Sequence, residues 1–325
     1  MYPGNLQQGF KIKNKKNRRL NISPVFFIAD IYTDQHVEIT TIQFYIIMQK
    51  KFIFIIAAIF LAGFAFGQTE PEYGNNPNAG HNLNTRGFNM YYEIYGTGAP
   101  LLIIHGNGGS INNFSKQIPY FEKEYKVILA DSRAHGKSVD TGDSLDYNLM
   151  ADDLNALLNH LKLDSCFVIG WSDGGINGLL LAIRHPEKVK KLAITGANLW
   201  PDTTAVEPSI FNWLASLVDS LKAVQKTPEI KNQYKLLEMM TREPNITLKQ
   251  LHTIKCPTLV IGGDHDALLP RHTLLIAENI PKSYLWILPN SGHSTPINYS
   301  RQFNETINDF FKTPYRLIER MDRLN

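Results

Sequence analysis

The sequence predicts an α/β protein with a mostly parallel, doubly wound sheet that helices cover on both faces. From residue 87 onward, short β-rich runs alternate with longer segments of helical apolar spacing. The strand-like runs are continuously apolar, which is typical of parallel strands buried on both sides. The expected strands are 88–96, 100–106, 126–133, 166–172, 191–198, 257–263 and 284–290, and the expected helices are 148–161, a helix from 174, 272–280 and 300–311.

One segment interrupts this alternation. Residues 200–248 contain two stretches of helical apolar spacing with no strand between them. We interpret them as a helical cap inserted into a core made of residues 87–199 and 249–325. Parallel sheets carry their sites at the carboxyl ends of the strands, so a cap there would close a pocket and exclude water. Residues 68–86, rich in Asn and Gly, are expected to form a flexible lead-in.

The first 67 residues differ from the rest in charge. They hold eight Lys and Arg against three Asp and Glu, whereas the remainder sums to −2. Once this part is removed, no basic surplus is left to neutralise phosphates, and we expect no nucleic-acid partner.

Residues 48–67 carry two lysines, a 15-residue apolar run and a small-x-small ending. This is the pattern of a secretory signal peptide, and the run is shorter than the roughly 20 residues that span a bilayer. We therefore expect a secreted or periplasmic protein without a stable membrane anchor after cleavage. The alternative is tethering by an uncleaved N-terminal segment. Residues 1–47 are expected to be a non-native or disordered leader ahead of a translation start at Met48.

A candidate nucleophile stands in the sequence Gly170-Trp171-Ser172-Asp173-Gly174. It matches G-x-S-x-G and lies after an apolar strand and before a helix, as that motif requires. The serine of such a motif occupies a tight turn, where larger flanking residues would collide with the neighbouring strand or helix. The alternative is that Ser172 only caps the helix.

A serine hydroxyl is a weak nucleophile and needs a base and an orienting acid. Both follow in chain order, because Asp264 and Asp266 end one strand and His293 follows the next. We predict His293 as the base, the alternative being a loop histidine without a catalytic role. We prefer Asp266 as the acid because it stands beyond the glycine turn, whereas Asp264 is suited to capping that turn.

A tetrahedral intermediate also needs two preorganised N–H donors. The first expected donor is the backbone N–H of Asp173, and the second is that of Asn107 in the glycine-rich segment after residues 100–104. His105 is expected to hold this loop by hydrogen bonds. In the segment D-S-R-A-H-G-K-S, Asp131 and Arg133 are expected to pair structurally.

The carboxylate of Asp173, beside the candidate nucleophile, has two interpretations. It caps the following helix, whose dipole favours an anion, or it points into the acyl pocket and pairs with a substrate ammonium.

Three further patterns limit the chemistry. The segment G-N-G-G-S lacks the G-x-G-x-x-G spacing of dinucleotide sites, and no Cys/His cluster has zinc-ligand spacing, so we expect neither a cofactor nor a metal. Cys166 and Cys256 each begin an apolar run, with one expected strand between them. Their Cα atoms would lie about 9 to 10 Å apart, which is too far for a disulfide. We predict two buried thiols.

These motifs, HG-x, D-x-R-x-HG-x-S, G-x-S-x-G, G-x-x-D and GH in this order, resemble those of the α/β-hydrolase family over residues 87–312. Within that family, "LLIIHGNGGS", "GWSDGGINGLLLA" and "ITGANLWPD" are most similar to the biphenyl hydrolase-like, valacyclovir hydrolase group of serine ester hydrolases. The resemblance implies cleavage of small carboxylic esters, including α-amino acid esters, through an acyl-enzyme. It also implies that Asp173 and Trp200 bind substrate.

Other activities stay open. Lactonase, carbon–carbon bond hydrolase, aminopeptidase-like and perhydrolase activities are compatible with a serine on this fold, as is a non-catalytic binding protein, although that predicts a broken triad. Haloalkane dehalogenases and epoxide hydrolases attack with a carboxylate where this chain has Ser172, which disfavours both.

Overall fold

An eight-stranded sheet forms the centre of the described structure. The computed structural model describes residues 72–224 and 227–318. Within them the strand order is β1-β2-β4-β3-β5-β6-β7-β8. Strand β2 runs antiparallel to both of its neighbours, β1 and β4, and each pair from β4 to β8 in this order, β3 included, is parallel. The predicted fold class is confirmed. The strands are β1 (Gly80–Thr85), β2 (Phe88–Tyr95), β3 (Ala99–Ile104), β4 (Tyr125–Ala130), β5 (Cys166–Trp171), β6 (Val189–Thr195), β7 (Thr258–Gly263) and β8 (Ser283–Leu288).

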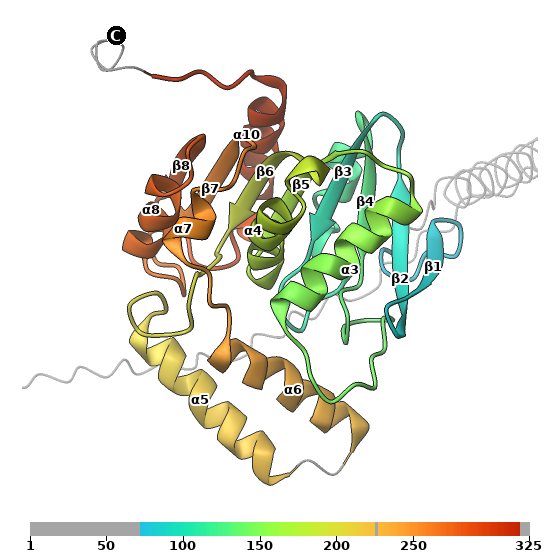
Figure 1. Ribbon diagram of the computed structural model, residues 1–325, viewed down its shortest axis with the longest axis vertical. Coiled ribbons are helices and arrows are strands. Elements are labelled where there is room, and N and C mark those ends of the chain that lie inside the picture. The colour runs from blue at the N-terminus through green and yellow to red at the C-terminus, as the bar shows by residue number, and fades with distance from the viewer. Residues whose placement is uncertain (1–71, 225–226, 319–325) are drawn as a thin grey trace, which may run out of the picture. The chain divides into compact units, whose positions relative to one another are not determined.

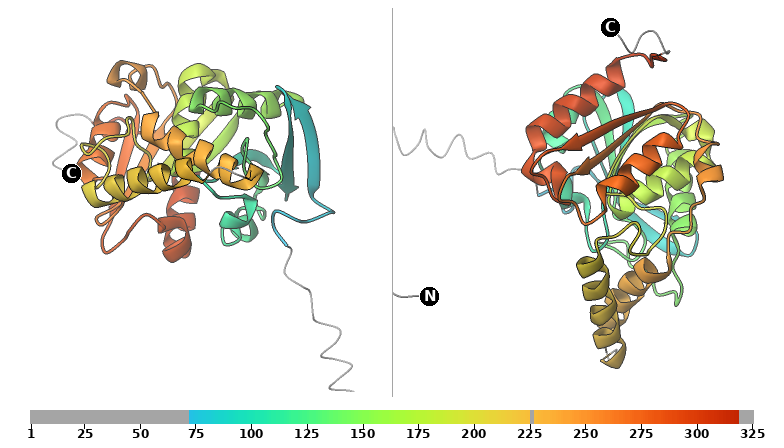
Figure 2. Two further views of the ribbon diagram at one scale, coloured as in Figure 1. Left: turned by 90° about the horizontal axis from the view of Figure 1, so that it is seen from below. Right: turned by 90° about the vertical axis from the view of Figure 1, so that its left-hand side faces the viewer.

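Helices cover both faces of this sheet (Figures 1 and 2). Helices α3, α4 and α8 lie on one face, and α2 and α10 lie on the other. The α-helices are α2 (Ile118–Phe121), α3 (Tyr147–His160), α4 (Asp173–Arg184), α5 (Pro208–Ala223), α6 (Pro228–Arg242), α7 (Leu248–Leu251), α8 (Pro270–Glu278), α9 (Thr295–Asn298) and α10 (Ser300–Lys312), and the 3-10 helices are η1 (Ile111–Phe114) and η2 (Pro186–Lys188).

Two apolar clusters, one on each face of the sheet, hold these layers together. In β3, Leu102 and Ile104 pack with residues of α3 and α4, whereas Leu101 and Ile103 pack with residues of α2 and α10. Successive strand residues point to opposite faces, so both faces of β3 are buried. This explains why its sequence is continuously apolar instead of alternating.

The predicted flexible lead-in at residues 68–86 is wrong for the part that the structure describes. Residues 80–85 form the edge strand β1, which pairs with β2 in antiparallel register. Ahead of β1, the backbone N–H groups of Gly74 and Asn76 donate to the buried carboxylate of Glu93 at 2.8 and 3.0 Å. The segment has little apolar patterning of its own. Its order comes from β2, which supplies both the ladder and the carboxylate.

The predicted state of the two cysteines is confirmed. Cys166 and Cys256 are free and buried, and β6 lies between the strand of Cys166 and β7, which follows Cys256. Burial raises the pKa of the Cys166 thiol to about 12 and that of Cys256 to about 11.

The segment predicted as a cap contains α5 and α6, with no strand in its described part. Both helices extend from the end of the sheet where the parallel strands finish (Figure 1). Helix α6 is attached to the core by side chains: Asn232 Nδ2 donates to the Ala134 carbonyl at 2.8 Å, and Lys235 Nζ donates to Asp140 Oδ2 at 2.8 Å. Helix α5 is more exposed, since Ile210 and Trp213 are 41% and 61% accessible.

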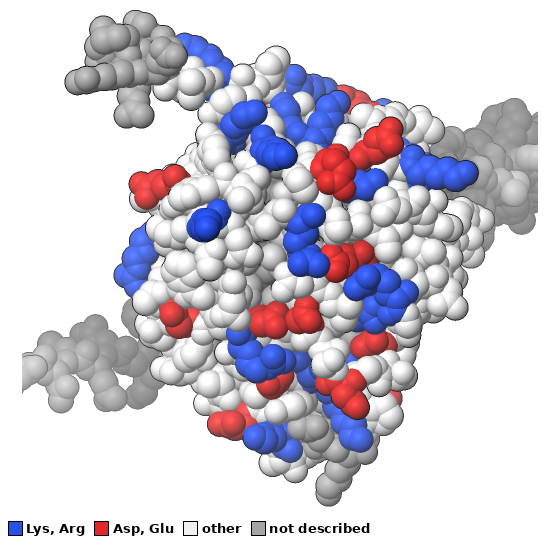
Figure 3. Space-filling model, viewed as in Figure 1, with Lys and Arg blue, Asp and Glu red and all other residues white. Residues whose placement is uncertain are grey.

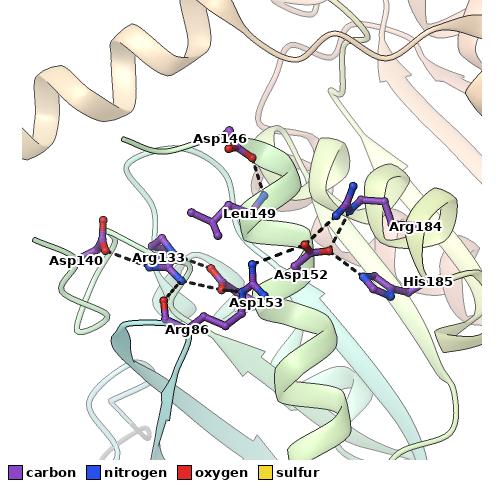
Figure 4. A network of polar contacts seen from close by, with 9 residues as sticks. All are labelled: Arg86, Arg133, Asp140, Asp146, Leu149, Asp152, Asp153, Arg184 and His185. Atoms are coloured by element: carbon purple, nitrogen blue, oxygen red, sulfur yellow. Dashed lines mark hydrogen bonds and ion pairs between the residues drawn. The ribbon is translucent and has the colours of Figure 1, made fainter. Parts of the chain in front are cut away.

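The expected pairing of Arg133 with Asp131 is wrong. Arg133 instead forms ion pairs with Asp153 at 2.7 Å and with Asp140 at 3.1 Å (Figure 4). Asp131 accepts the backbone N–H groups of Ile111 and Lys137 at 3.0 and 2.7 Å. Asp131 joins its own loop to η1, whereas Arg133 reaches α3. No local pattern predicts this pair, because Asp153 is twenty residues away from Arg133.

The predicted leader (1–47) and signal peptide (48–67) lie outside the described residues. In residues 72–224 and 227–318, no helix combines the length and the apolar character needed to cross a bilayer. Acidic and basic side chains are interspersed on the face of the described part seen in Figure 3.

Candidate active site

Ser172 stands on the tight turn between β5 and α4. Its φ of 58° and ψ of −123° are unusual for a residue with a side chain, and its N–H donates to the Thr195 carbonyl on β6 at 2.9 Å. A Cβ at Gly170 would overlap the carbonyl of Gly174, and one at Gly174 would overlap the carbonyl of Ile104 on β3. The two glycines of the motif are therefore required by close packing of the turn against its neighbours.

Three side chains from three strand ends form a continuous hydrogen-bonded chain at this turn. His293 Nε2 lies 2.9 Å from Ser172 Oγ, and His293 Nδ1 lies 2.7 Å from Asp266 Oδ1. The Asp266 carboxylate is buried and also accepts the backbone N–H of Leu268 at 3.2 Å. Because an ionised carboxylate only accepts, Nδ1 carries a proton and Nε2 is left to accept one from the serine hydroxyl.

Asp264, the alternative acid, lies elsewhere. Its Oδ1 accepts the backbone N–H of Ser291 at 3.0 Å and contacts the exposed ring of His265. The bond from the Asn290 backbone is the largest of the effects that lower the Asp264 pKa to about 2. Asp264 thus supports the loop before His293 without touching the His293 ring.

The glycine-rich loop after β3 lies directly against Ser172. A Cβ at Gly106 would be 2.9 Å from the Ser172 Cβ. His105 holds the loop, because its Nδ1 donates to the Gly106 carbonyl at 2.8 Å and its Nε2 accepts the Ser132 N–H at 2.9 Å. In the described part of the chain, the backbone N–H groups of Asn107 and Asp173 donate to no other residue. Both remain available beside the serine hydroxyl.

The Asp173 side chain is almost fully buried, with 3% exposure. Its Oδ2 accepts from Asn107 Nδ2 at 3.0 Å, and the Tyr147 hydroxyl is a second donor. Burial raises the Asp173 pKa, and these two hydrogen bonds partly oppose the rise. Among the described residues, neither an N–H group of α4 nor a basic side chain bonds to this carboxylate. The helix-capping interpretation therefore lacks its expected bond.

Trp200 is not joined to this group. Its ring lies edge-on to His272 at 4.9 Å between ring centres, and its Nε1 donates to Thr204 at 2.8 Å. In the described residues no hydrogen bond or ring contact links it to Ser172 or Asp173. We therefore leave Trp200 out of the site.

Two contacts of the site were not foreseen from the sequence. Tyr147, the first residue of α3, reaches Asp173, and the carbonyl of Leu236 on α6 accepts from Asn107 Nδ2 at 3.3 Å. No local pattern marks either residue, because both contacts join segments far apart in the chain. In the described residues, no group of three His, Cys, Asp or Glu side chains is placed to hold a metal ion.

Residues 99–237 match the sequence profile of the alpha/beta hydrolase fold family. The structure is also similar, with a TM-score of 0.61 and 24% identity, to that of Est816, titled as an N-acyl homoserine lactone degrading enzyme, over 71% of this chain and 100% of that one. The chain therefore has the α/β-hydrolase fold.

The chain is similar in sequence to proteins named as different hydrolases. It is 26% identical over 246 residues to the mouse serine hydrolase BPHL (Mus musculus), covering 70% of this chain and 84% of that protein. It is 27% identical over 269 residues to 2-hydroxymuconate semialdehyde hydrolase of Pseudomonas sp. strain CF600, covering 73% and 95%. Both of these proteins are named as hydrolases, and the bond that this chain would cleave has to be argued from its own site.

Proposed function

We propose that this protein is a serine hydrolase that cleaves small carboxylic esters through an acyl-enzyme. The observation that carries the proposal is the unbroken chain from Ser172 Oγ to His293 to Asp266, at 2.9 and 2.7 Å. This arrangement supplies a nucleophile, a base and an orienting acid.

The proposed reaction has two halves. His293 Nε2 takes the Ser172 proton as Oγ attacks the ester carbonyl carbon, and the resulting oxyanion accepts the backbone N–H groups of Asn107 and Asp173. The carbon–oxygen bond then breaks, and His293 gives its proton to the departing alcohol. A water molecule repeats the sequence on the acyl-enzyme, releasing the acid and restoring Ser172.

We propose α-amino acid esters as the substrate class. Two features support this: the carboxylate of Asp173 is buried beside Ser172 and is joined to no basic side chain of the described residues, and the relatives include serine hydrolase BPHL. A substrate ammonium would provide the opposite charge. A hydrogen bond to a charged group contributes about 1.5–3 kcal/mol, so an amino ester should be preferred over its des-amino analogue by about ten- to a hundredfold.

A lactone is a cyclic ester and would follow the same steps, and Est816 is a structural neighbour. An acyl-homoserine lactone carries no ammonium, so Asp173 would have no charge to pair with in such a substrate. The buried carboxylate therefore favours amino esters over neutral lactones.

A fluorophosphonate probe tests the mechanism. Wild type should be labelled, and Ser172→Ala should not. Failure to label wild type, or equal labelling of both proteins, contradicts the serine mechanism. The substrate class is tested separately by comparing kcat/KM for phenylalanine and 3-phenylpropionate methyl esters. Equal values reject the amino-ester proposal but leave a serine esterase.

We also propose export through the signal pattern at residues 48–67. N-terminal sequencing of the protein purified from its own host should begin shortly after residue 67. A chain that begins at Met1 or Tyr2 rejects this proposal.

A further inference from the structure

His135 lies in the loop after β4 with one ring nitrogen committed and the other unused. It is buried, with 4% exposure. Its Nδ1 lies 2.8 Å from the Arg133 carbonyl, which only accepts, so Nδ1 carries the proton. Burial lowers the His135 pKa to about 4, and the ring is neutral at pH 7. Its Nε2 is therefore an acceptor, and no described residue donates to it.

A second unused acceptor stands close by on the cap. Asn232 of α6 donates through Nδ2 to the carbonyl of Ala134, the residue before His135, at 2.8 Å. That bond fixes the orientation of the amide, because a carbonyl cannot face a carbonyl. The remaining Oδ1 is buried and accepts from no described residue.

Both acceptors are carried by segments that neighbour the partners of Asp173. The centre of the His135 ring lies 5.1 Å from that of His105, in the loop that carries Asn107. The charge of Asp173 acts on His135 and opposes the fall in its pKa. From α6, Leu236 lies one helical turn after Asn232, and its carbonyl shares the Asn107 amide with the Asp173 carboxylate. The same face of α6 thus reaches from the loop of His135 to the bonded partner of Asp173.

A carboxylate, an imidazole nitrogen and an amide oxygen have one feature in common, which is that all three accept hydrogen bonds. Buried acceptors are normally paired with donors. A primary ammonium has one positive charge and three N–H donors, and it matches this set in both charge and number.

We propose that His135 Nε2 and Asn232 Oδ1, together with Asp173, bind the α-ammonium group of the substrate, which makes His135 and Asn232 specificity-determining residues. The proposal rests on the proposed hydrolysis of α-amino acid esters. In this arrangement α6 takes part in substrate selection directly, because one of the three acceptors is carried by the cap.

The test measures the ratio of kcat/KM for phenylalanine methyl ester to that for 3-phenylpropionate methyl ester in wild type, His135→Phe and Asn232→Leu. Each variant removes one acceptor, and each should lower the ratio roughly tenfold. Asn232→Leu also removes the bond from α6 to the Ala134 carbonyl, so Lys235→Met, which loosens α6 without removing an acceptor, is its control and should keep the wild-type ratio. The matched control is His272→Phe. His272 is also a buried histidine, but its Nε2 already accepts the Leu199 N–H at 3.0 Å. Replacing His272 should therefore leave the ratio at the wild-type value.

A third substrate separates charge from hydrogen bonding. The methyl ester of N,N,N-trimethylphenylalanine keeps the positive charge but has no N–H group. Wild type should prefer the primary ammonium, and this preference should shrink in His135→Phe and Asn232→Leu. Fluorophosphonate labelling verifies that each variant retains a formed site. If His135→Phe does not fold, Asn232→Leu and the comparison of primary with quaternary ester in wild type decide the question.

The outcomes separate the two proposals. If Asp173→Asn lowers the ratio while His135→Phe and Asn232→Leu keep the wild-type value, the role of His135 and Asn232 is overturned and amino-ester hydrolysis stands. If wild type cleaves both esters equally, the substrate class fails and the ammonium site fails with it. If wild type is not labelled at all, the failure lies in the serine mechanism.

Discussion

The tight turn that carries Ser172 and the helical cap meet at one site but are held in place by different interactions. The turn is fixed by the backbone: Ser172 is bonded to Thr195 on the neighbouring strand, and Gly170 and Gly174 lie too close to carbonyl groups for any side chain. Helix α6 is instead attached through side chains: Lys235 bonds Asp140, Asn232 bonds the Ala134 carbonyl, and Leu236 and Met239 are buried in the core.

This difference separates chemistry from selection. The strand ends hold Ser172, His293 and Asp266 in register because the parallel sheet fixes where each strand finishes. The cap lies outside the sheet and contacts the site through α6, whose Leu236 carbonyl accepts from Asn107. Substitutions at the strand ends should therefore alter turnover or folding severely, whereas those in the cap should cause smaller and more local losses.

The largest effect is expected at the acid. Asp266→Asn keeps the shape of the side chain but removes the charge that orients His293 and stabilises it when protonated. We expect kcat to fall by about 10⁴-fold with the fold retained. Steady-state kinetics with an ester, together with circular dichroism, provides the measurement. The matched control is Asp264→Asn, which should cost far less because Asp264 bonds the loop backbone. A larger loss in Asp264→Asn would show that the acid has been assigned to the wrong residue.

The backbone packing of the turn is tested by Gly170→Ala. The added methyl group meets the Gly174 carbonyl, which cannot move without shifting the start of α4. We expect a loss of about 3 kcal/mol or more in the free energy of unfolding, measured by urea denaturation. Gly142→Ala is the control, because its Cβ would have its nearest neighbour at 3.5 Å. Similar stability of the two variants would contradict the packing argument.

The buried charge beside the nucleophile should appear in the pH dependence. Burial raises the Asp173 pKa, so in the free enzyme this carboxylate takes up a proton at a higher pH than an ordinary aspartate does. As the pH falls through that range, the ratio of kcat/KM for amino and des-amino esters should fall towards one. The requirement for neutral His293 is common to both esters and cancels in the ratio. A ratio that stays constant down to the ordinary aspartate range would count against Asp173 as the ammonium partner.

The smallest effect is expected in the cap. Lys235 Nζ lies 2.8 Å from Asp140 Oδ2 and 2.8 Å from the Gly142 carbonyl, with the lysine side chain 12% exposed. Lys235→Met should lower the free energy of unfolding by about 2 kcal/mol and speed amide exchange in α6. Lys222→Met on α5 is the control, because Lys222 is exposed and should change stability by less than about 0.5 kcal/mol. Equal effects would remove the distinction between the two cap helices.

Much of the site was visible in the sequence because its signals are local. The glycines around Ser172 and the polar residues after β7 and β8 follow from chain order and strand ends alone. The choice of Asp266 over Asp264 also depended on local position, namely the distance of each carboxylate from the glycine turn, and the structure places Asp266 against His293.

Other features depend on partners distant in the chain, and for these the sequence-based predictions were wrong or were not made. The lead-in was predicted to be flexible because its own residues carry little apolar pattern. The contacts that order it come from Glu93 and the edge of β2. Arg133 was assigned to Asp131, two residues away, although its buried partner is Asp153 on α3. Tyr147 and α6 could not be connected with Asp173 before the chain was folded.

The sequence by itself determined the α/β architecture, the order of the candidate nucleophile, acid and base, and the glycines on which the turn depends. Periodicity, strand ends and steric limits are properties of neighbouring residues. Only the tertiary structure decided that Asn107 and Tyr147 donate to the Asp173 carboxylate, and that His135 and Asn232 each keep a buried acceptor to which no described residue donates. These residues come from the loops after β3 and β4 and from α3 and α6. The burial of the Asp173 carboxylate and the polar groups around it exist only once these segments pack together.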